Sequence, residues 1–138
     1  MQSRLNPYIT FNNQAKEAME FYKTVFGGKL VTSTYKEGGV SQDPAEGDKL
    51  MHAMLEAHNG LVLMGADNPS HDKYEAGTNI SISLSGDNES ELKGYWDKLS
   101  NGAKITAPLS KAPWGDTFGM LTDKFGIQWL VNISGKKA

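Results

Sequence analysis

The sequence predicts an α+β fold built from two similar modules, each with the order strand, helix, strand, strand, strand. The stretch NPYITFNNQAKEAMEFYKTVFGGK, residues 6–29, returns in outline as NISISLSGDNESELKGYWDKLSNGAK, residues 79–104. Each copy passes from alternating apolar residues into an amphipathic helix with paired aromatics and then reaches glycine. A long period that occurs only twice indicates paired modules and not a solenoid.

The spacing of the two copies predicts where they differ. Gly28 matches Gly102 at an offset of 74 residues (102 minus 28), and the helix aromatics share that offset. The leading asparagines, Asn6 and Asn79, are offset by 73 residues (79 minus 6). We therefore expect the second copy to hold one additional residue between its first strand and its helix.

The first module begins with a short strand over residues 8–11, after which Asn13 is expected to cap a helix. Apolar residues at spacings of three and four give this helix one buried face: Ala15, Ala18, Met19, Tyr22, Val25 and Phe26. Gly27 and Gly28 should end the helix, because glycine adopts the left-handed conformation without steric cost.

The rest of the first module is expected to be three strands. Residues 29–36 form the second strand, and residues 37–49, rich in glycine and charge, are expected to be a mobile loop. Residues 51–57 and 61–65 follow as strands. The turn His58-Asn59-Gly60 joins them, with Asn-Gly supplying the positive backbone angles of a tight hairpin.

The second module repeats this order. After a strand near residues 80–84, Asn88 caps a helix and Glu91 can return a bond to the cap backbone. The buried stripe of this helix is Leu92, Tyr95, Trp96 and Leu99. We then expect a strand at residues 103–106, a loop at 108–113, and two strands, 116–122 and 127–133, joined by a turn at 123–126.

Composition limits the classes of function. The chain of 138 residues should form one domain, with module one at about 1–66, a linker at about 67–77 and module two at about 78–138. Its 14 basic and 16 acidic residues form no basic stripe, so nucleic acid is not an expected partner. Without cysteine it has no disulfide, and no apolar run reaches membrane-spanning length. The opening MQSRLNPY lacks a secretory core, so we expect a cytoplasmic protein.

These segments resemble a known family. NPYITF with EAMEFYKTVFGG, DKLMHAMLE, NISISLSGD and PLSKAPWGDTFGMLTDKFGIQWLVNI are similar to the PhnB-like branch of the vicinal oxygen chelate superfamily, which includes glyoxalase I, bleomycin-resistance proteins and extradiol dioxygenases. The similarity covers nearly the whole chain. It implies two βαβββ modules forming cupped half-barrels around a ligand or metal site, usually in a homodimer that exchanges or pairs modules.

The resemblance also implies a divalent metal held by His and Glu on the first and last strands of each module. The matching positions are Asn6, Asn79 (or Ser81, depending on where the additional residue lies), Met64 and Leu130. Asparagine rarely anchors a metal, and Met and Leu cannot serve a hard cation. We therefore predict no metal or other cofactor at the usual site.

Histidines are the next candidates. Strict alternation places His52 on the same strand face as Met54 and Glu56. If that face lines the cup, His52 is a polar contact, a base, or one ligand of an unconventional metal site with Glu56; the alternative is the outer face of the sheet. His58 lies in a turn and His71 in the linker, where solvation is the simpler interpretation.

Aromatic side chains complete the candidate set. Trp114, Phe118 and Trp129 suit an organic ligand, because pockets are mostly apolar with few polar groups. Their alternative role is core or dimer interface, and that role is favoured for Trp96. Trp129 shares a face with Ile127 and Val131. Asp116 and Asp123 are turn residues first.

Three functions remain open. The first is a homodimer that binds a small organic ligand without metal through His52, Met54, Glu56 and the aromatic residues. The second is a metal-dependent lyase, isomerase or dioxygenase with a relocated site at His52 and Glu56. The third is a scaffold that has lost its chemistry. No phosphate loop, HExxH or GxSxG motif is present in the sequence.

Overall fold

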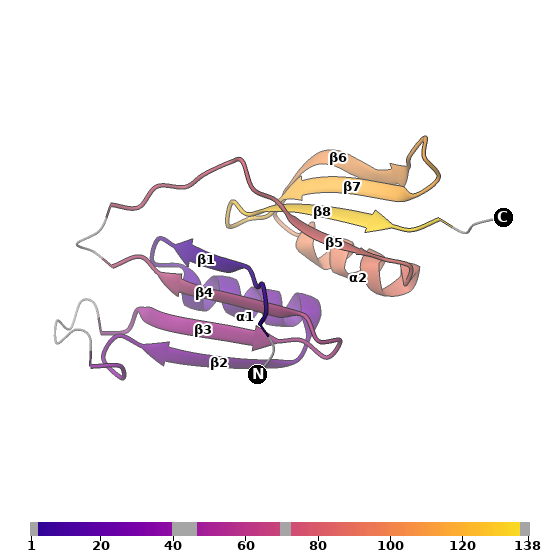
Figure 1. Ribbon diagram of the computed structural model, residues 1–138. Helices are drawn as coiled ribbons and strands as arrows, with labels where there is room; N and C mark the ends of the chain where they lie inside the picture. The colour runs from indigo at the N-terminus through magenta and orange to yellow at the C-terminus, as the bar shows by residue number, and fades with distance from the viewer. Residues whose placement is uncertain (1–2, 40–46, 70–72, 136–138) are drawn as a thin grey trace. The chain divides into compact units, whose positions relative to one another are not determined.

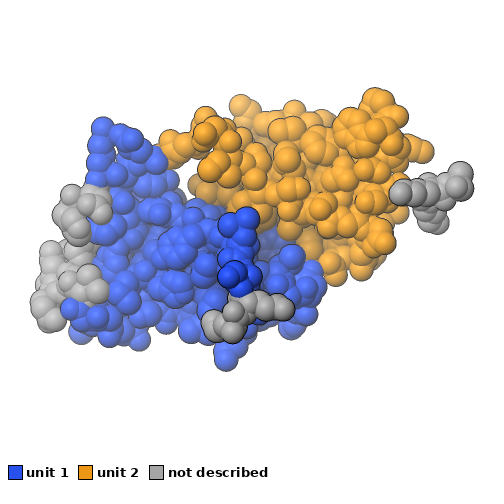
Figure 2. Space-filling view, in the orientation of Figure 1, with its two compact units in different colours: residues 1–75 blue, residues 76–138 orange. Residues whose placement is uncertain are grey.

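The computed structural model describes residues 3–39, 47–69 and 73–135. The chain divides into two compact units, residues 1–75 and 76–138 (Figure 2). Each unit has the predicted order of strand, helix and three strands (Figure 1). Neither helix in the described part of the chain has the length and apolar content needed to cross a membrane.

The first unit is an open four-stranded mixed sheet with one helix on one face (Figure 1). The strand order is β1-β4-β3-β2, with β1 parallel to β4 and the other pairs antiparallel. The elements are β1 (Tyr8–Phe11), α1 (Ala15–Phe26), β2 (Lys29–Thr34), β3 (Leu50–Glu56) and β4 (Val62–Asp67). The six apolar residues predicted for the buried face of α1 are all buried.

Helix α1 begins differently from the prediction. Asn13 does not cap it, because Asn13 adopts a left-handed conformation (φ 67°) and the N-cap position is Gln14, whose side chain makes no capping hydrogen bond. The buried carboxylate of Asp67, at the end of β4, accepts a hydrogen bond from Ala15 N at 2.9 Å instead. A partner distant in sequence therefore satisfies one of the amides that a helix start leaves free.

Asp67 also fixes the start of β3. Its second carboxylate oxygen accepts a hydrogen bond from Leu50 N at 2.9 Å, and its backbone carbonyl accepts one from the buried hydroxyl of Tyr35 at 2.6 Å. Beyond β2, Tyr35 N donates to Lys49 O, so the two chain segments stay paired there. Residues 40–46 of the predicted mobile loop lie outside the described residues.

The second unit repeats the sheet with the order β5-β8-β7-β6, again with one parallel pair, β5 with β8. Its elements are β5 (Ile82–Gly86), α2 (Glu89–Leu99), β6 (Lys104–Lys111), β7 (Thr117–Thr122) and β8 (Gln128–Ile133). As predicted, the Asn88 side chain caps α2 by accepting from Glu91 N at 3.1 Å, and the predicted stripe of α2 is buried.

Trp96 packs into the core of the second unit, as the sequence indicated. A β-carbon at Gly119 on β7 would lie 2.8 Å from Trp96 Cη2 and 3.0 Å from Leu109 Cα. The sheet therefore needs glycine there for the indole ring of α2 to lie against it.

The loop predicted at residues 108–113 is wrong in its first part, because β6 continues to Lys111 through Pro108. Strand β6 lies at the edge of its sheet, and its pairing with β7 is interrupted between Ile105 and Ala107 and again between Ala107 and Ser110. An edge strand with bulges accommodates proline, since one side of its backbone needs no ladder partner.

The two β-hairpins that close the units share their turn geometry. In one, Ala57 N donates to Leu61 O; in the other, Asp123 N donates to Ile127 O. The predicted turns are thus present, although in the first only Gly60 has a positive φ (83°), so Asn59 does not supply a second positive angle. The exposed His58 is not merely solvated: its Nε2 accepts a hydrogen bond from Gly28 N at 3.2 Å. His71 lies outside the described residues.

These turns align the two units and correct the predicted offset. Equivalent turns place Met64 level with Leu130, because 130 minus 64 equals 123 minus 57. Met64 pairs with Tyr8, and Leu130 pairs with Ser83. The first strands are therefore offset by 75 (83 minus 8) and not 73, so the first unit carries the additional residue before its helix.

Candidate functional site

Each sheet has one face covered by the helix of its own unit and one face without it. In β3, Ala53 and Leu55 are buried on the helix side, whereas His52, Met54 and Glu56 alternate with them on the other side. We call this second side of sheet β1-β4-β3-β2 the open face. Its residues, by alternation along the four strands, are Tyr8, Thr10, Lys29, Val31, Ser33, His52, Met54, Glu56, Val62, Met64 and Ala66.

An apolar row crosses the centre of the open face. Tyr8 pairs with Met64, Met64 with Met54, and Met54 with Val31, so the four side chains stand side by side across all four strands. Tyr8 and Val31, at the two edges, are each 51% exposed. Directly opposed side chains lie about 5 Å apart at their β-carbons, so the row forms a continuous apolar strip.

His52 borders this row. Its ring lies 5.9 Å from the ring of Tyr8, centroid to centroid, with the planes tilted by 31°. The two residues lie on strands separated by β4, whose open-face residue beside His52 is the small Ala66, one step on from the pair Ala53 and Gly65. A small residue there leaves room for the two rings to meet above the middle strand.

Glu56 lies at the other end of β3, opposite Lys29 and Val62. Four residues of a strand separate it from His52, a distance of about 13 Å, with Met54 between them. One metal ion cannot be held by both side chains in that arrangement. The geometry therefore does not favour the relocated metal site at His52 and Glu56.

The positions of the superfamily's usual metal ligands carry other chemistry. Met64 and Leu130 lie on the sheet faces away from the helices, and by the corrected offset the counterpart of Asn6 is Ser81 and not Asn79. Within residues 3–39, 47–69 and 73–135, no three His, Cys, Asp or Glu side chains gather closely enough to hold an ion. These donors do not fit a divalent cation of the family's kind.

The corresponding face of the second sheet is more polar. One row across it is Ser83, Leu130, Met120 and Ala107, and the next is Ser85, Asn132, Phe118 and Ser110. Phe118 thus lies on the face away from α2, as a ligand contact must. It is flanked by an amide and by serines, in contrast to the methionines of the first sheet.

Trp114 stands at the end of this second face. It is 63% exposed, and its ring meets that of Phe118 edge to face at 5.8 Å. The hairpin that carries it is held by Asp116, whose carboxylate accepts from Asn132 Nδ2 at 3.0 Å and from Gly135 N at 2.8 Å. The two aromatics are therefore presented on a well-braced turn.

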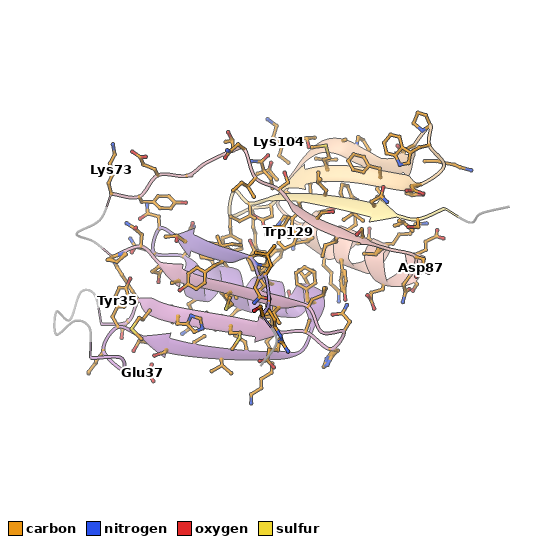
Figure 3. All side chains as sticks on the ribbon, in the orientation of Figure 1. Tyr35, Glu37, Lys73, Asp87, Lys104 and Trp129 are labelled. Atoms are coloured by element: carbon orange, nitrogen blue, oxygen red, sulfur yellow. The ribbon has the colours of Figure 1, made fainter. Side chains whose placement is uncertain are left out.

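Trp129 lies on the opposite side of its sheet. It is labelled in Figure 3, is 2% exposed, and donates from Nε1 to the buried Asp123 Oδ2 at 2.8 Å. It shares the α2 side with Val131 and does not meet Phe118. Asp123 is a turn residue, as predicted, since its other oxygen accepts from Phe125 N and Ile127 N.

The predicted site residues therefore fall into three places. His52, Met54 and Glu56 are together on the open face, Phe118 and Trp114 are together on the second sheet, and Trp129 is in the core of the second unit. Sequence reasoning did not include Tyr8, Met64 and Val31 as ligand contacts. Alternation within β1 gave the face of Tyr8, but only the strand register shows that it stands beside Met64.

Comparison with known proteins follows this geometry. The family model described as "Glyoxalase/Bleomycin resistance protein/Dioxygenase superfamily" matches residues 4–131. Protein YjdN of Escherichia coli is 27% identical over 139 residues, covering 94% of each chain. Protein PA1353 from Pseudomonas aeruginosa has a solved structure that is 34% identical, with a TM-score of 0.82, covering 98% of this chain and 100% of that one. The PhnB protein from Bacillus cereus is 26% identical, with a TM-score of 0.77, covering 96% and 100%.

Proposed function

Because the chain belongs to the glyoxalase/bleomycin resistance protein/dioxygenase superfamily, we propose that it is a homodimer that binds a small organic molecule without a metal ion. Membership alone does not choose between catalysis and binding, since the superfamily's name joins enzymes with resistance proteins. The choice rests on the residues that stand on the open face.

The observation that carries the proposal is the chemistry of the apolar row. Where the superfamily resemblance implies a carboxylate ligand, this chain has Met64, set between Tyr8 and Met54. Thioethers and an aromatic ring favour an organic surface and offer nothing to a hard cation. His52 and Glu56 at the borders of the row supply the few polar contacts that orient a ligand in an apolar site.

A ligand screen on metal-free protein tests this function. The protein is treated with a chelator and mixed with a library of small organic molecules, and saturation-transfer NMR detects those that bind. We expect hits whose signals weaken in His52→Ala and Met54→Ala. Hits that appear only after zinc, nickel or manganese is restored would contradict metal-independent binding.

Two further parts of the proposal have separate tests. The homodimer is expected to elute with the mass of two 15.1 kDa chains when light scattering follows gel filtration. A cytoplasmic location is expected from fractionation of the source cells with an antibody to the protein.

A further inference from the structure

We infer that the ligand of the open face has a flat, largely apolar body that lies on Met54 and Met64 between Tyr8 and Val31, with one hydrogen-bonding group directed at His52. This inference rests on the proposed function and adds the chemical class of the ligand. It follows from the arrangement of three features: the row, its borders and the matching face of the second sheet.

The row sets the shape. Three interstrand steps of about 4.8 Å make it about 14 Å long, enough for a body of two fused rings. Two adjacent methionines form its middle, and their flexible side chains adapt to a flat surface and make favourable sulfur–aromatic contacts. The half-exposed Tyr8 and Val31 at the ends leave the strip accessible from above.

The borders set the polarity. On one side His52 stands opposite Ser33, and on the other Glu56 stands opposite Lys29. Glu56 and Lys29 are oppositely charged cross-strand neighbours, so their fields largely offset each other. The border with His52 and Ser33 offers neutral donors and acceptors. A ligand that carries a single hydroxyl or similar group, and little net charge, matches both borders.

The second sheet argues against a protein surface as the occupant. Its face away from α2 includes Ser83, Ser85, Thr122, Gln128 and Asn132 by alternation and register. Copies of that face would leave hydroxyls and amides against the methionines, where unpaired polar groups cost free energy. A small apolar molecule leaves no such group unpaired.

The test uses the full chain labelled with 13C at the methionine ε-methyl groups. The probe is 2-naphthol, which is flat, neutral and bears one hydroxyl; the control is decahydro-2-naphthol, which has the same ring skeleton but is not flat. We expect ring-current shifts at Met54 and Met64, no shift at Met120 of the second sheet or at the buried Met19, and affinity for the flat probe at least fivefold above that for the saturated one.

Variants localise the effect. Met54→Ala should weaken 2-naphthol binding by about tenfold, and Met54→Leu by less, whereas Met120→Ala, the matched position on the second sheet, should leave it unchanged. Because Met54 is not fully buried, its truncation should leave the fold intact, which a methyl spectrum with unshifted core signals confirms.

Other results would overturn the inference. These are a shift at Met120 with none at Met54 and Met64, equal binding of the saturated probe, Met54 signals that move on dilution because a second copy covers them, or no methionine shift with any probe. None of these results rejects the proposed function, because metal-free binding of another ligand class would still appear in the screen. Failure of that screen with every compound would reject the function itself.

Discussion

The two units start their helices by different means, although their sheets have the same order. Helix α2 begins on a local cap, the side chain of Asn88, which lies directly before it. Helix α1 begins on Asp67, which is 5% exposed and comes from the last strand of its unit. The first unit carries one more residue before its helix, and Asn13, the counterpart of Asn88 at the strand offset of 75, is turned into a left-handed conformation.

This difference shows how a repeated fold can exchange a local stabilising contact for a distant one. A local cap forms with its helix, but Asp67 can cap α1 only after β4 has joined the sheet. The distant cap also reaches β3 through Leu50 N, so one carboxylate connects three elements. We expect the first unit to depend more strongly on its single capping residue than the second.

The largest effect is expected from Asp67→Ala. It removes the acceptor of two buried hydrogen bonds, from Ala15 N and Leu50 N. Each buried amide left without a partner costs about 1–3 kcal/mol, so the free energy of unfolding should fall by about 2–4 kcal/mol. Urea unfolding followed by circular dichroism measures this. Asp67→Asn, which keeps one acceptor oxygen, should lose less; equal losses would mean that the pair of bonds is not the cause.

The hairpin turns provide the next comparison. Asp123→Ala removes an acceptor from Phe125 N, Ile127 N and the buried indole N–H of Trp129. The stability loss should be about 2 kcal/mol, chiefly from the unpaired indole. Ala57, its counterpart in the first unit, has no such side chain. Trp129→Phe in the Asp123→Ala background should therefore cost less than Trp129→Phe alone, and additive losses would contradict the coupling.

A smaller loss is expected from Asn88→Ala. Removal of a single local N-cap costs about 1 kcal/mol. Thermal unfolding should show a smaller decrease than Asp67→Ala, and Asn88→Ser should restore most of it. If Asn88→Ala destabilised the protein as much as Asp67→Ala does, the contrast between the local and the distant cap would fail.

The smallest effect concerns an exposed carboxylate in the first unit. Glu37 accepts a hydrogen bond from Thr34 N at 3.0 Å, and its own N–H donates to Thr34 Oγ1. The hydrogen bond from the Thr34 backbone, and then that with its side chain, lower the pKa of Glu37 below its ordinary value. Because the folded pKa is lowered, any stabilisation is present above the unfolded pKa and is lost as pH falls through the folded value.

NMR titration of the Glu37 carboxyl carbon measures this shift. We expect a midpoint below the ordinary value for glutamate, and Thr34→Ala should move it only part of the way back, since the larger contribution comes from the backbone N–H. A midpoint in Thr34→Ala that equals the ordinary value would show that the side chain carries the whole effect.

Local features of the fold could be predicted from the sequence. Apolar spacing predicted the buried stripes of both helices, and Asn88 predicted its cap, because these depend on neighbours within a few residues. The Asp67 cap and the extension of β6 through Pro108 could not be predicted in this way. Both depend on which strands become neighbours and which become edges.

The candidate site divides along the same line. Alternation correctly grouped His52 with Met54 and Glu56, and Trp129 with Val131. It could not say which face of each strand the helix covers, so it placed the buried Trp129 beside the less buried Phe118 as a ligand contact. The row from Tyr8 to Val31 required the pairing register of four strands, three of them distant in sequence from β1.

Metal content is the most direct test of the central claim that the site works without a metal ion. Untagged protein purified without chelator is analysed by mass spectrometry for elements and then titrated by calorimetry with zinc, nickel, manganese and ferrous iron. The account predicts far less than one ion per chain and no saturable heat. One ion bound per chain, with loss of that ion in His52→Ala, would contradict it and support metal-dependent chemistry on the open face.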